Sequence, residues 1–424
     1  MSALFSEQYA KQLDEQDALS HFRNGFHIPE INGVQQLYFC GNSLGLQPKS
    51  TRAAITQELD DWAAFGVEGH FHAKHPWMPY HAELRDLLAE CVGAKPIEVV
   101  AMNSLTVNLH LLMVSFYQPS AKRPAIIIEQ GAFPSDRYAV ESQIRFHGFD
   151  PVECLIEISA DESTGLIDEH ALENAMKIHG HRVAMILWPG VQYRTGQAFD
   201  LQATTELGHF YGCKVGFDLA HAVGNMPLQL HASGADFAAW CSYKYLNSGP
   251  GSIAGAFVHE RHAEAELPRF HGWWGNQQDS RFKMAAQFKA AAGADGWQLS
   301  NPPIFAMAPL RASLEIFQAA GLTNLREKSM QLTAYLEALI QQELSSVIRS
   351  LTPKAPEQRG CQLSLQVLAG REQGRDLFEH LMHNHIIGDW REPDVIRLSP
   401  TPLYNSFNDC YQVVNRIKQW AKLV

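Results

Sequence analysis

The sequence predicts an α/β protein, with a large domain built on a mostly parallel sheet flanked by helices and a smaller α+β domain. Two observations favour this class. Between residues 84 and 260 short apolar runs alternate with helix-length segments, and after Asn301 long helices precede a second alternating region. The 424 residues also exceed the roughly 250–300 that one hydrophobic core usually serves. We therefore expect a large domain at 46–319 and a small domain made of 1–45 and 320–424.

The predicted strands of the large sheet are apolar without interruption, as is typical of strands that helices cover on both faces. They occupy residues 98–102, 125–128, 183–187, 214–217 and 255–258. Because helix-length segments separate them, we expect crossover connections and parallel pairing.

The C-terminal region predicts an α+β arrangement. Helices are expected at 304–319, 323–344 and 373–384, strands at 362–367 and 395–398, and a closing amphipathic helix at 410–424. Gly321 separates the first two helices, which is a usual position for glycine. The first 40 or so residues are too short to fold alone, so we expect them to pack against this domain.

The composition excludes several classes of protein. Against 45 Asp and Glu there are 34 Lys and Arg, a formal charge of −11 with no basic run, so we expect no nucleic acid partner. No apolar run reaches the ~18 residues that cross a bilayer, which predicts a cytoplasmic protein with no membrane partner. The seven cysteines are scattered without a C-x-x-C pair, which indicates reduced thiols, mostly in the core.

The most informative stretch is VGFDLAHAVG at 215–224, followed by CSYKYLNSGPG at 241–251. Asp218 ends a predicted strand, and Lys244 follows 26 residues later in a turn. An enzyme that uses pyridoxal phosphate (PLP) needs such a pair, because the lysine condenses with the cofactor aldehyde and the carboxylate keeps the pyridine nitrogen protonated. Taken singly, Asp218 could cap a helix and Lys244 could be a surface cation. Taken together, we expect both to be catalytic.

At these residues the sequence closely resembles the kynureninase family, whose members are fold type I PLP enzymes. The resemblance covers nearly the whole chain, from YFCGNSLGLQP at 38–48 to PLYNSF at 402–407. It implies hydrolysis of the Cβ–Cγ bond of kynurenine or 3-hydroxykynurenine, with L-alanine and anthranilate or 3-hydroxyanthranilate as products. It also implies a homodimer with shared active sites.

The resemblance implies a phosphate site at the start of a helix. The amides of Leu105 and Thr106 and the Thr106 hydroxyl would hold the cofactor phosphate, because a helix N-terminus suits an anion. The alternative is that Asn103 or Ser104 simply caps this helix.

The segment Phe133, Pro134, Ser135 and Asp136 resembles the family segment that contacts the cofactor ring. The resemblance implies that Phe133 stacks on the pyridine and that Asp136 contacts the ring side. The simpler alternative for Phe133 is core packing.

Two further residues flank the central pair. His221, which we place one helical turn after Asp218, would face the ring, and Tyr243 would reach the phosphate and serve as the proton shuttle. A buried histidine with satisfied hydrogen bonds is the alternative for His221. Pro189 departs from the family pattern, in which some members carry a hydroxyl residue, so a cofactor contact there is an open question.

Loops from the neighbouring subunit would complete the site. The resemblance implies that Trp273 and Asn301 contact the cofactor and that Ser300 and Asn301 lie beside the substrate. These residues would come from the partner subunit of a homodimer. A turn aromatic and a helix cap are the alternatives for Trp273 and Asn301. Arg397 matches the arginine that grips the substrate carboxylate in a bidentate pair, with a structural ion pair as the alternative.

Substrate choice is expected to depend on His70 and Asn301, with Ser300 alongside. This pair recurs in family members that favour 3-hydroxykynurenine. Buried groups that hydrogen-bond a phenolic hydroxyl discriminate against an analogue that lacks it. The alternative leaves His70 on a polar loop with no ligand contact.

Other functions remain open. The chain could be another fold type I enzyme, such as an aminotransferase or a cysteine desulfurase, but Cys361 lies in an apparent strand and no loop cysteine stands out. It could also be a PLP-binding regulator without turnover, although it lacks a basic DNA-binding appendage. The twenty histidines include clusters, yet no H-E-x-x-H signature is present, so we expect no catalytic metal.

Overall fold

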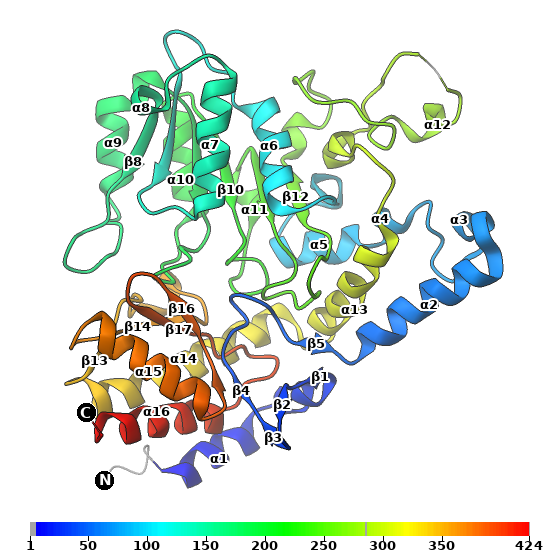
Figure 1. Cartoon of the computed structure of the whole chain (residues 1–424). Coiled ribbons are helices and arrows are strands. Elements are labelled where there is room, and N and C mark those ends of the chain that lie inside the picture. Colours follow the sequence, from blue (N-terminus) through cyan, green and yellow to red (C-terminus); the bar gives the residue numbers. More distant parts are fainter. Residues whose placement is uncertain (1–5, 285, 424) are drawn as a thin grey trace.

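The computed structural model describes residues 6–284 and 286–423. Its large sheet has seven strands in the order β6-β12-β11-β10-β9-β7-β8 (Figure 1). Their bounds are β6 Val99–Ala101, β7 Ala125–Glu129, β8 Leu155–Ile158, β9 Val183–Pro189, β10 Lys214–Asp218, β11 Phe237–Trp240 and β12 Gly255–Val258. Only β12 runs antiparallel to its neighbours. The predicted mostly parallel sheet is confirmed, and β8 and β11 are strands that the sequence pattern did not reveal.

Helices surround this sheet. Their bounds are α2 Ser50–Phe65, α3 Gly69–His72, α4 Tyr80–Glu83, α5 Arg85–Val92, α6 Leu105–Phe116, α7 Pro134–Phe146, α8 Pro151–Cys154, α9 Ala171–His179, α10 Leu201–Phe210, α11 Leu230–Ser233, α12 Gln278–Arg281 and α13 Ile304–Ala320.

The strands are apolar throughout because their alternate side chains enter two different cores. In β7, Ile126 and Ile128 pack in one core with Leu109 of α6 and Ile144 of α7. The intervening Ile127 lies in the second core, which also holds residues of α5, α10 and α13. Burial on both faces leaves the strand ends as the places where polar side chains reach solvent.

The small domain contains an antiparallel sheet in the order β13-β14-β17-β16. Its elements are β13 Ile348–Ser350, β14 Leu363–Val367, β16 Asp389–Arg391, β17 Val395–Leu398, α14 Leu322–Leu344, α15 Arg371–His383 and α16 Phe407–Ala421. The N-terminal helix α1 (Glu7–Gln16) lies beside α16, as expected (Figure 1). Ala10 and Phe39 share a core with Leu336 and Val413.

Gly321 joins the two domains through a one-residue junction between α13 and α14. Its φ of 77° lies in the left-handed region that glycine adopts without strain. The boundaries 46–319 and 320–424 remain a proposal, because Leu19, Phe26 and Tyr404 from the small-domain segments pack in a core of the large domain. Within the described residues, no helix is both long and apolar enough to cross a membrane.

Candidate active site

A cavity of about 390 Å³ lies at the carboxyl edge of the large sheet. Glu129, Pro189 and Asp218 end β7, β9 and β10, and all three line it. The carboxyl ends of parallel strands meet at one edge, which is where α/β proteins bind ligands. The cavity gathers most of the predicted cofactor ligands, namely Leu105, Thr106, Phe133, Ser135, Asp136, Asp218, His221, Tyr243 and Lys244.

One end of the cavity suits an anion. The helices α6 and α7 both begin there, and Thr106 Oγ1 lies 2.7 Å from Ser135 Oγ. The side chain of Ser104 makes no capping hydrogen bond, so the first amides of α6 have no side-chain cap. The capping alternative for Ser104 therefore fails, and a phosphate placed here would accept from free N–H groups.

The cavity wall also contains two buried aspartates. Asp218 Oδ1 accepts a hydrogen bond of 2.7 Å from the Ala220 amide, which fixes the carboxylate. Asp136 is buried and its Oδ1 has no hydrogen-bond partner. Burial, and next the Asp218 carboxylate, raise the pKa of Asp136 well above its ordinary value. Such a pair of carboxyl groups suits a ligand that brings a proton or a positive charge, as a pyridinium nitrogen does.

Lys244 also lines the cavity. Its Nζ lies 3.0 Å from Nε2 of His221 and 5.9 Å from the ring centroid of Phe133. Burial, followed by the Lys244 charge, lowers the pKa of His221 well below its ordinary value, so the imidazole is neutral. The turn that carries His221 is not helical, so our placement of His221 one helical turn after Asp218 was wrong, although both residues line the cavity.

These residues fit PLP. The cavity offers helix N-termini for a phosphate, a lysine amine for an aldehyde and carboxyl groups for a ring nitrogen. In addition, Asp136 Oδ1 and His221 Nδ1 are buried polar atoms without partners. Both residues line the cavity, so these two atoms are available to hydrogen-bond a polar ligand there.

Several predicted residues lie outside this cavity. Pro134 is the first residue of α7 but is not among the lining residues. Arg397 lies on β17 as expected, is fully buried, pairs with Asp389 at 2.8 Å and donates to the Tyr193 carbonyl at 2.7 Å. The structural ion pair considered for Arg397 is therefore present, and Arg391 is the arginine that lines the cavity.

The residues expected from the partner subunit also lie elsewhere. Trp273, Ser300 and Asn301 are exposed, and Trp273 Nε1 donates to the Arg281 carbonyl. Asn301 does not cap α13, whose cap position is Pro303. His70, in α3, packs edge-on against Trp77, and its Nδ1 lies 2.9 Å from the Val67 carbonyl oxygen. Within one chain, none of these four lines the cavity.

Some residues of the cavity wall were not among the ligands expected from the sequence. They are Ser43, Ser104, Glu129, Pro189, Val191, Tyr193, Ala220 and Arg391. Glu129 is the most notable, because burial raises its pKa to about 8. The signal that identified Asp218, a carboxylate at the end of an apolar run, applies equally to Glu129. Arg391 gave no such signal, since its position depends on the small domain.

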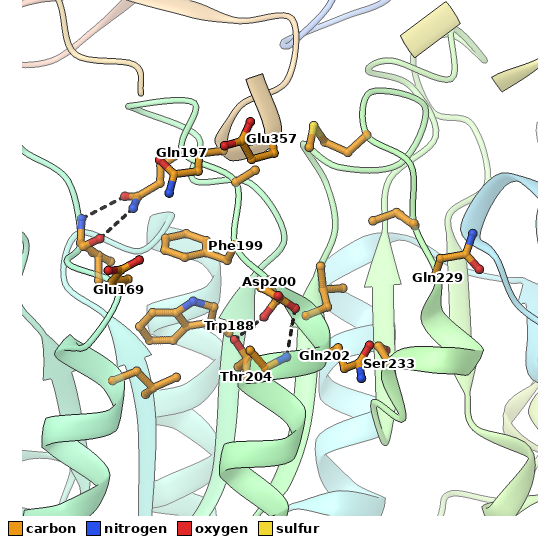
Figure 2. A pocket seen from close by; sticks show the side chains of 18 of the residues that line it. Glu169, Trp188, Gln197, Phe199, Asp200, Gln202, Thr204, Gln229, Ser233 and Glu357 are labelled. Atoms are coloured by element: carbon orange, nitrogen blue, oxygen red, sulfur yellow. Dashed lines mark hydrogen bonds between the residues drawn. The ribbon is translucent and has the colours of Figure 1, made fainter. Parts of the chain in front are cut away.

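A larger cavity of about 1100 Å³ lies between the large domain and residues 356–358 of the small domain (Figure 2). Two of its polar side chains already have protein partners. Gln197 exchanges two hydrogen bonds with the backbone of Ile167, and Asp200 caps α10 by accepting from the Ala203 amide. It contains none of the predicted site residues, so volume alone does not identify the active site.

The cysteines give no support to a desulfurase. Cys361 precedes β14 instead of lying within a strand, which corrects our expectation, but it is buried and burial raises its thiol pKa to about 12. A reactive cysteine needs an accessible thiolate.

Comparison with known proteins identifies the family of the chain. The family model described as the kynureninase C-terminal domain matches residues 325–417. Kynureninase of Stenotrophomonas maltophilia is 58% identical over 424 residues, all of both chains, and kynureninase of Xanthomonas campestris pv. campestris (strain B100) is 56% identical over 421 residues, 99% of each chain.

Solved structures show the fold. The cysteine desulfurase CsdA of Escherichia coli matches with a TM-score of 0.77 and 17% identity, covering 96% of this chain and 99% of its own. A mutant of C-DES with glycine covalently linked to its PLP cofactor matches with a TM-score of 0.76 and 18% identity, covering 90% of this chain and 96% of its own. The fold is that of fold type I PLP enzymes, and the full-length identity shows that the chain belongs to the kynureninase family of PLP-dependent enzymes.

Proposed function

We propose that the protein hydrolyses the Cβ–Cγ bond of L-kynurenine and 3-hydroxy-L-kynurenine, releasing L-alanine and anthranilate or 3-hydroxyanthranilate. The observation that carries this proposal is the cavity that gathers Lys244, Asp218 and the start of α6 in a chain with full-length kynureninase relatives. This reaction would place the protein in cytoplasmic tryptophan catabolism and in the supply of quinolinate for NAD biosynthesis.

Lys244, Asp218 and Asp136 would handle the protons at the cofactor. Bound PLP supplies an electron sink for carbon–hydrogen and carbon–carbon cleavage. A Lys244 amine that is not bonded to the cofactor could take the proton from Cα. Asp218 and Asp136 would hold a proton at the pyridine nitrogen, and the neutral imidazole of His221, 3.0 Å from Lys244, would accept a hydrogen bond from the amine.

Water then adds to the γ-ketone, and collapse of the hydrate breaks the Cβ–Cγ bond. Tyr243 is our candidate for the proton shuttle at these atoms, because its side chain lines the cavity next to Lys244. Burial raises the pKa of Tyr243, so the phenol stays protonated and can donate. One water enters, and the products are an aromatic acid and alanine.

Arg397 is our proposed anchor for the substrate carboxylate, with Arg391 beside it. Asp389 pairs with both, at 2.8 Å from Arg397 Nη2 and 2.9 Å from Arg391 Nε. Arg397 is thus held against Tyr193, a residue of the cavity wall. Two guanidinium groups that share one aspartate keep net positive charge available for a carboxylate.

A homodimer with shared active sites is part of the proposal. Large apolar side chains are exposed along the segment from α2 to α3, near Trp273 and at the start of α13, namely Leu59, Trp62, Phe65, Val67, Phe71, Phe270, Phe282 and Phe305. Figure 1 shows α2, α3 and α12 projecting on the same side of the molecule. Such a surface favours burial against a second copy, which would bring Trp273, Ser300 and Asn301 to a neighbouring cavity.

A product assay tests the reaction directly. Holoenzyme incubated with kynurenine should release anthranilate and alanine in equal amounts. Release of a keto acid with conversion of PLP to its amine form would indicate an aminotransferase. Release of sulfide from cysteine would indicate a desulfurase, and bound PLP without any product would indicate a regulator. Each of these three results, in the absence of anthranilate, would overturn the proposal.

Shared sites are tested by mixing Lys244→Ala, which should be inactive, with Asn301→Ala, which should be impaired. Hybrid dimers would contain one cavity with an intact Lys244 and an intact Asn301. Recovery of activity on mixing supports the shared site, and no recovery from variants shown to exchange subunits contradicts it.

A further inference from the structure

Three metal-ligating side chains meet at the edge of the large sheet opposite the active site. Glu98 directly precedes β6, whose other end leads to Ser104 and the cavity. Because β12 is antiparallel to β6, His259, which follows β12, returns to the same edge as Glu98. The third residue, His231, lies in α11, so three separate segments contribute one side chain each.

The distances suit a common metal ion. Nδ1 of His231 lies 2.9 Å from Oε1 of Glu98, and Nδ1 of His259 lies 3.7 Å from the same oxygen. One ligand atom from each of the three residues lies within 4.8 Å of the others. Zinc bonds to nitrogen and oxygen of about 2.0–2.2 Å at tetrahedral angles place ligand atoms roughly 3.3–3.6 Å apart. The two distances to Glu98 Oε1 lie on either side of this spacing, and the stacked His231 and His259 rings, whose centroids are 5.1 Å apart, would have to rotate for both nitrogens to face one ion.

The carboxylate is held in place but lacks a strong cationic partner. Glu98 is fully buried, and backbone amides donate to both of its oxygens, Lys95 N to Oε2 and Glu260 N to Oε1, each at 2.8 Å. Among the described residues, the salt-bridge partners of Glu98 are His231 and His259, and neither is a lysine or arginine. Burying a charged carboxylate without a cation is costly, and a bound divalent ion would remove this cost.

We propose that Glu98, His231 and His259 form a binding site for a divalent transition-metal ion of the zinc type. The ion displaces the proton shared by His231 and Glu98, and it replaces the Arg261 amide that donates to Nδ1 of His259 at 3.1 Å. His231 is 34% exposed, which leaves a fourth position for water. The ion ties together the segments before β6, at α11 and after β12, and has no part in the reaction at Lys244.

Zinc titration of the full-length holoenzyme, after removal of metals with a chelator, tests the site. The variants are His231→Ala and His259→Ala, and His181→Ala, which removes an exposed histidine outside the cluster, is the matched control. Wild type and the control should each bind one equivalent of zinc. Each cluster variant should bind zinc at least about tenfold more weakly, since loss even of a group that supports a metal ligand lowers metal affinity 10- to 100-fold. Turnover of kynurenine should stay unchanged in His231→Ala, which also shows that the variant is folded.

Cobalt gives an independent measurement on the unmutated protein. One equivalent of Co²⁺ should produce the visible bands of a four-coordinate site, and Zn²⁺ should abolish them. The absence of these bands in wild type, or zinc binding of equal stoichiometry and affinity in all four proteins, would overturn the proposal.

Discussion

The Nζ atom of Lys244 lies 3.0 Å from the Nε2 atom of His221, and both residues line the cavity. Two basic groups so close together cannot both carry a proton easily, and burial already disfavours the charged imidazole. The neutral imidazole can therefore accept a hydrogen bond from the amine. This contact holds the Lys244 amine in the cavity that Phe133 and Asp218 also line, where we place the cofactor.

Asp218→Asn tests whether the charge of Asp218 matters. The asparagine can still accept from the Ala220 amide, as Asp218 does at 2.7 Å, but it cannot keep a pyridine nitrogen protonated. We expect weaker PLP binding in a cofactor titration and at least ~10²-fold slower product formation at saturating PLP. Normal binding and turnover would reduce Asp218 to a structural residue of the turn.

The stability of cofactor-free protein should fall as the pH rises through 8, because of Glu129. Burial raises the pKa of Glu129 from 4.5 to about 8, so the folded state holds its proton more tightly than the unfolded state. This contribution is fully present below pH 4.5 and is lost as the pH rises through 8. Between pH 6 and pH 8.5, the unfolding free energy of wild type should fall by about 2 kcal/mol more than that of the Glu129→Gln variant. Urea unfolding at both pH values measures this difference, and parallel pH profiles would contradict it.

Arg391→Lys and Arg397→Lys separate two candidates for the substrate carboxylate. A lysine cannot form the bidentate pair of a guanidinium. If Arg397 is the anchor, Arg397→Lys should raise KM at least about tenfold, which is about 1.4 kcal/mol, and Arg391→Lys should raise it less. Steady-state kinetics of the two variants measure the change in KM. Their urea unfolding midpoints are the control, because substitution of the buried Arg397 could also destabilise the fold. A larger KM effect at Arg391 would transfer the assignment to that residue.

Substrate choice should favour the hydroxylated substrate. We expect a higher kcat/KM for 3-hydroxykynurenine than for kynurenine, and a smaller preference in the His70→Trp, Asn301→Thr double mutant, because buried polar groups are left unpaired by the substrate that lacks the hydroxyl. Equal kcat/KM values in wild type would refute this preference without affecting the reaction itself.

The sequence was sufficient to predict the centre of the site, because that centre depends on local pattern. Asp218 ends an apolar strand, and Lys244 lies in a short turn before another strand, so their relation to the sheet edge follows from strand direction. The same rule extends to Glu129. The strand β8, by contrast, was missed because it contains Glu157 and is only partly buried at the edge of the sheet.

The periphery of the site could not be predicted from local pattern. Arg391 reaches the cavity from β16, in a different domain, and the burial of Arg397 depends on Asp389 from a neighbouring strand. Local sequence contains no information on how two domains meet. The roles that we propose for Trp273 and Asn301 would likewise depend on a second copy of the chain, which local pattern does not describe.

Lys244→Ala provides the most direct test of the account. The substitution removes the amine that holds the cofactor and takes the Cα proton, while the start of α6 and the carboxyl groups of Asp136 and Asp218 remain. Anthranilate released from kynurenine should fall more than ~10²-fold in folded protein supplied with PLP. Release at the wild-type rate would contradict the assignment of this cavity as the active site.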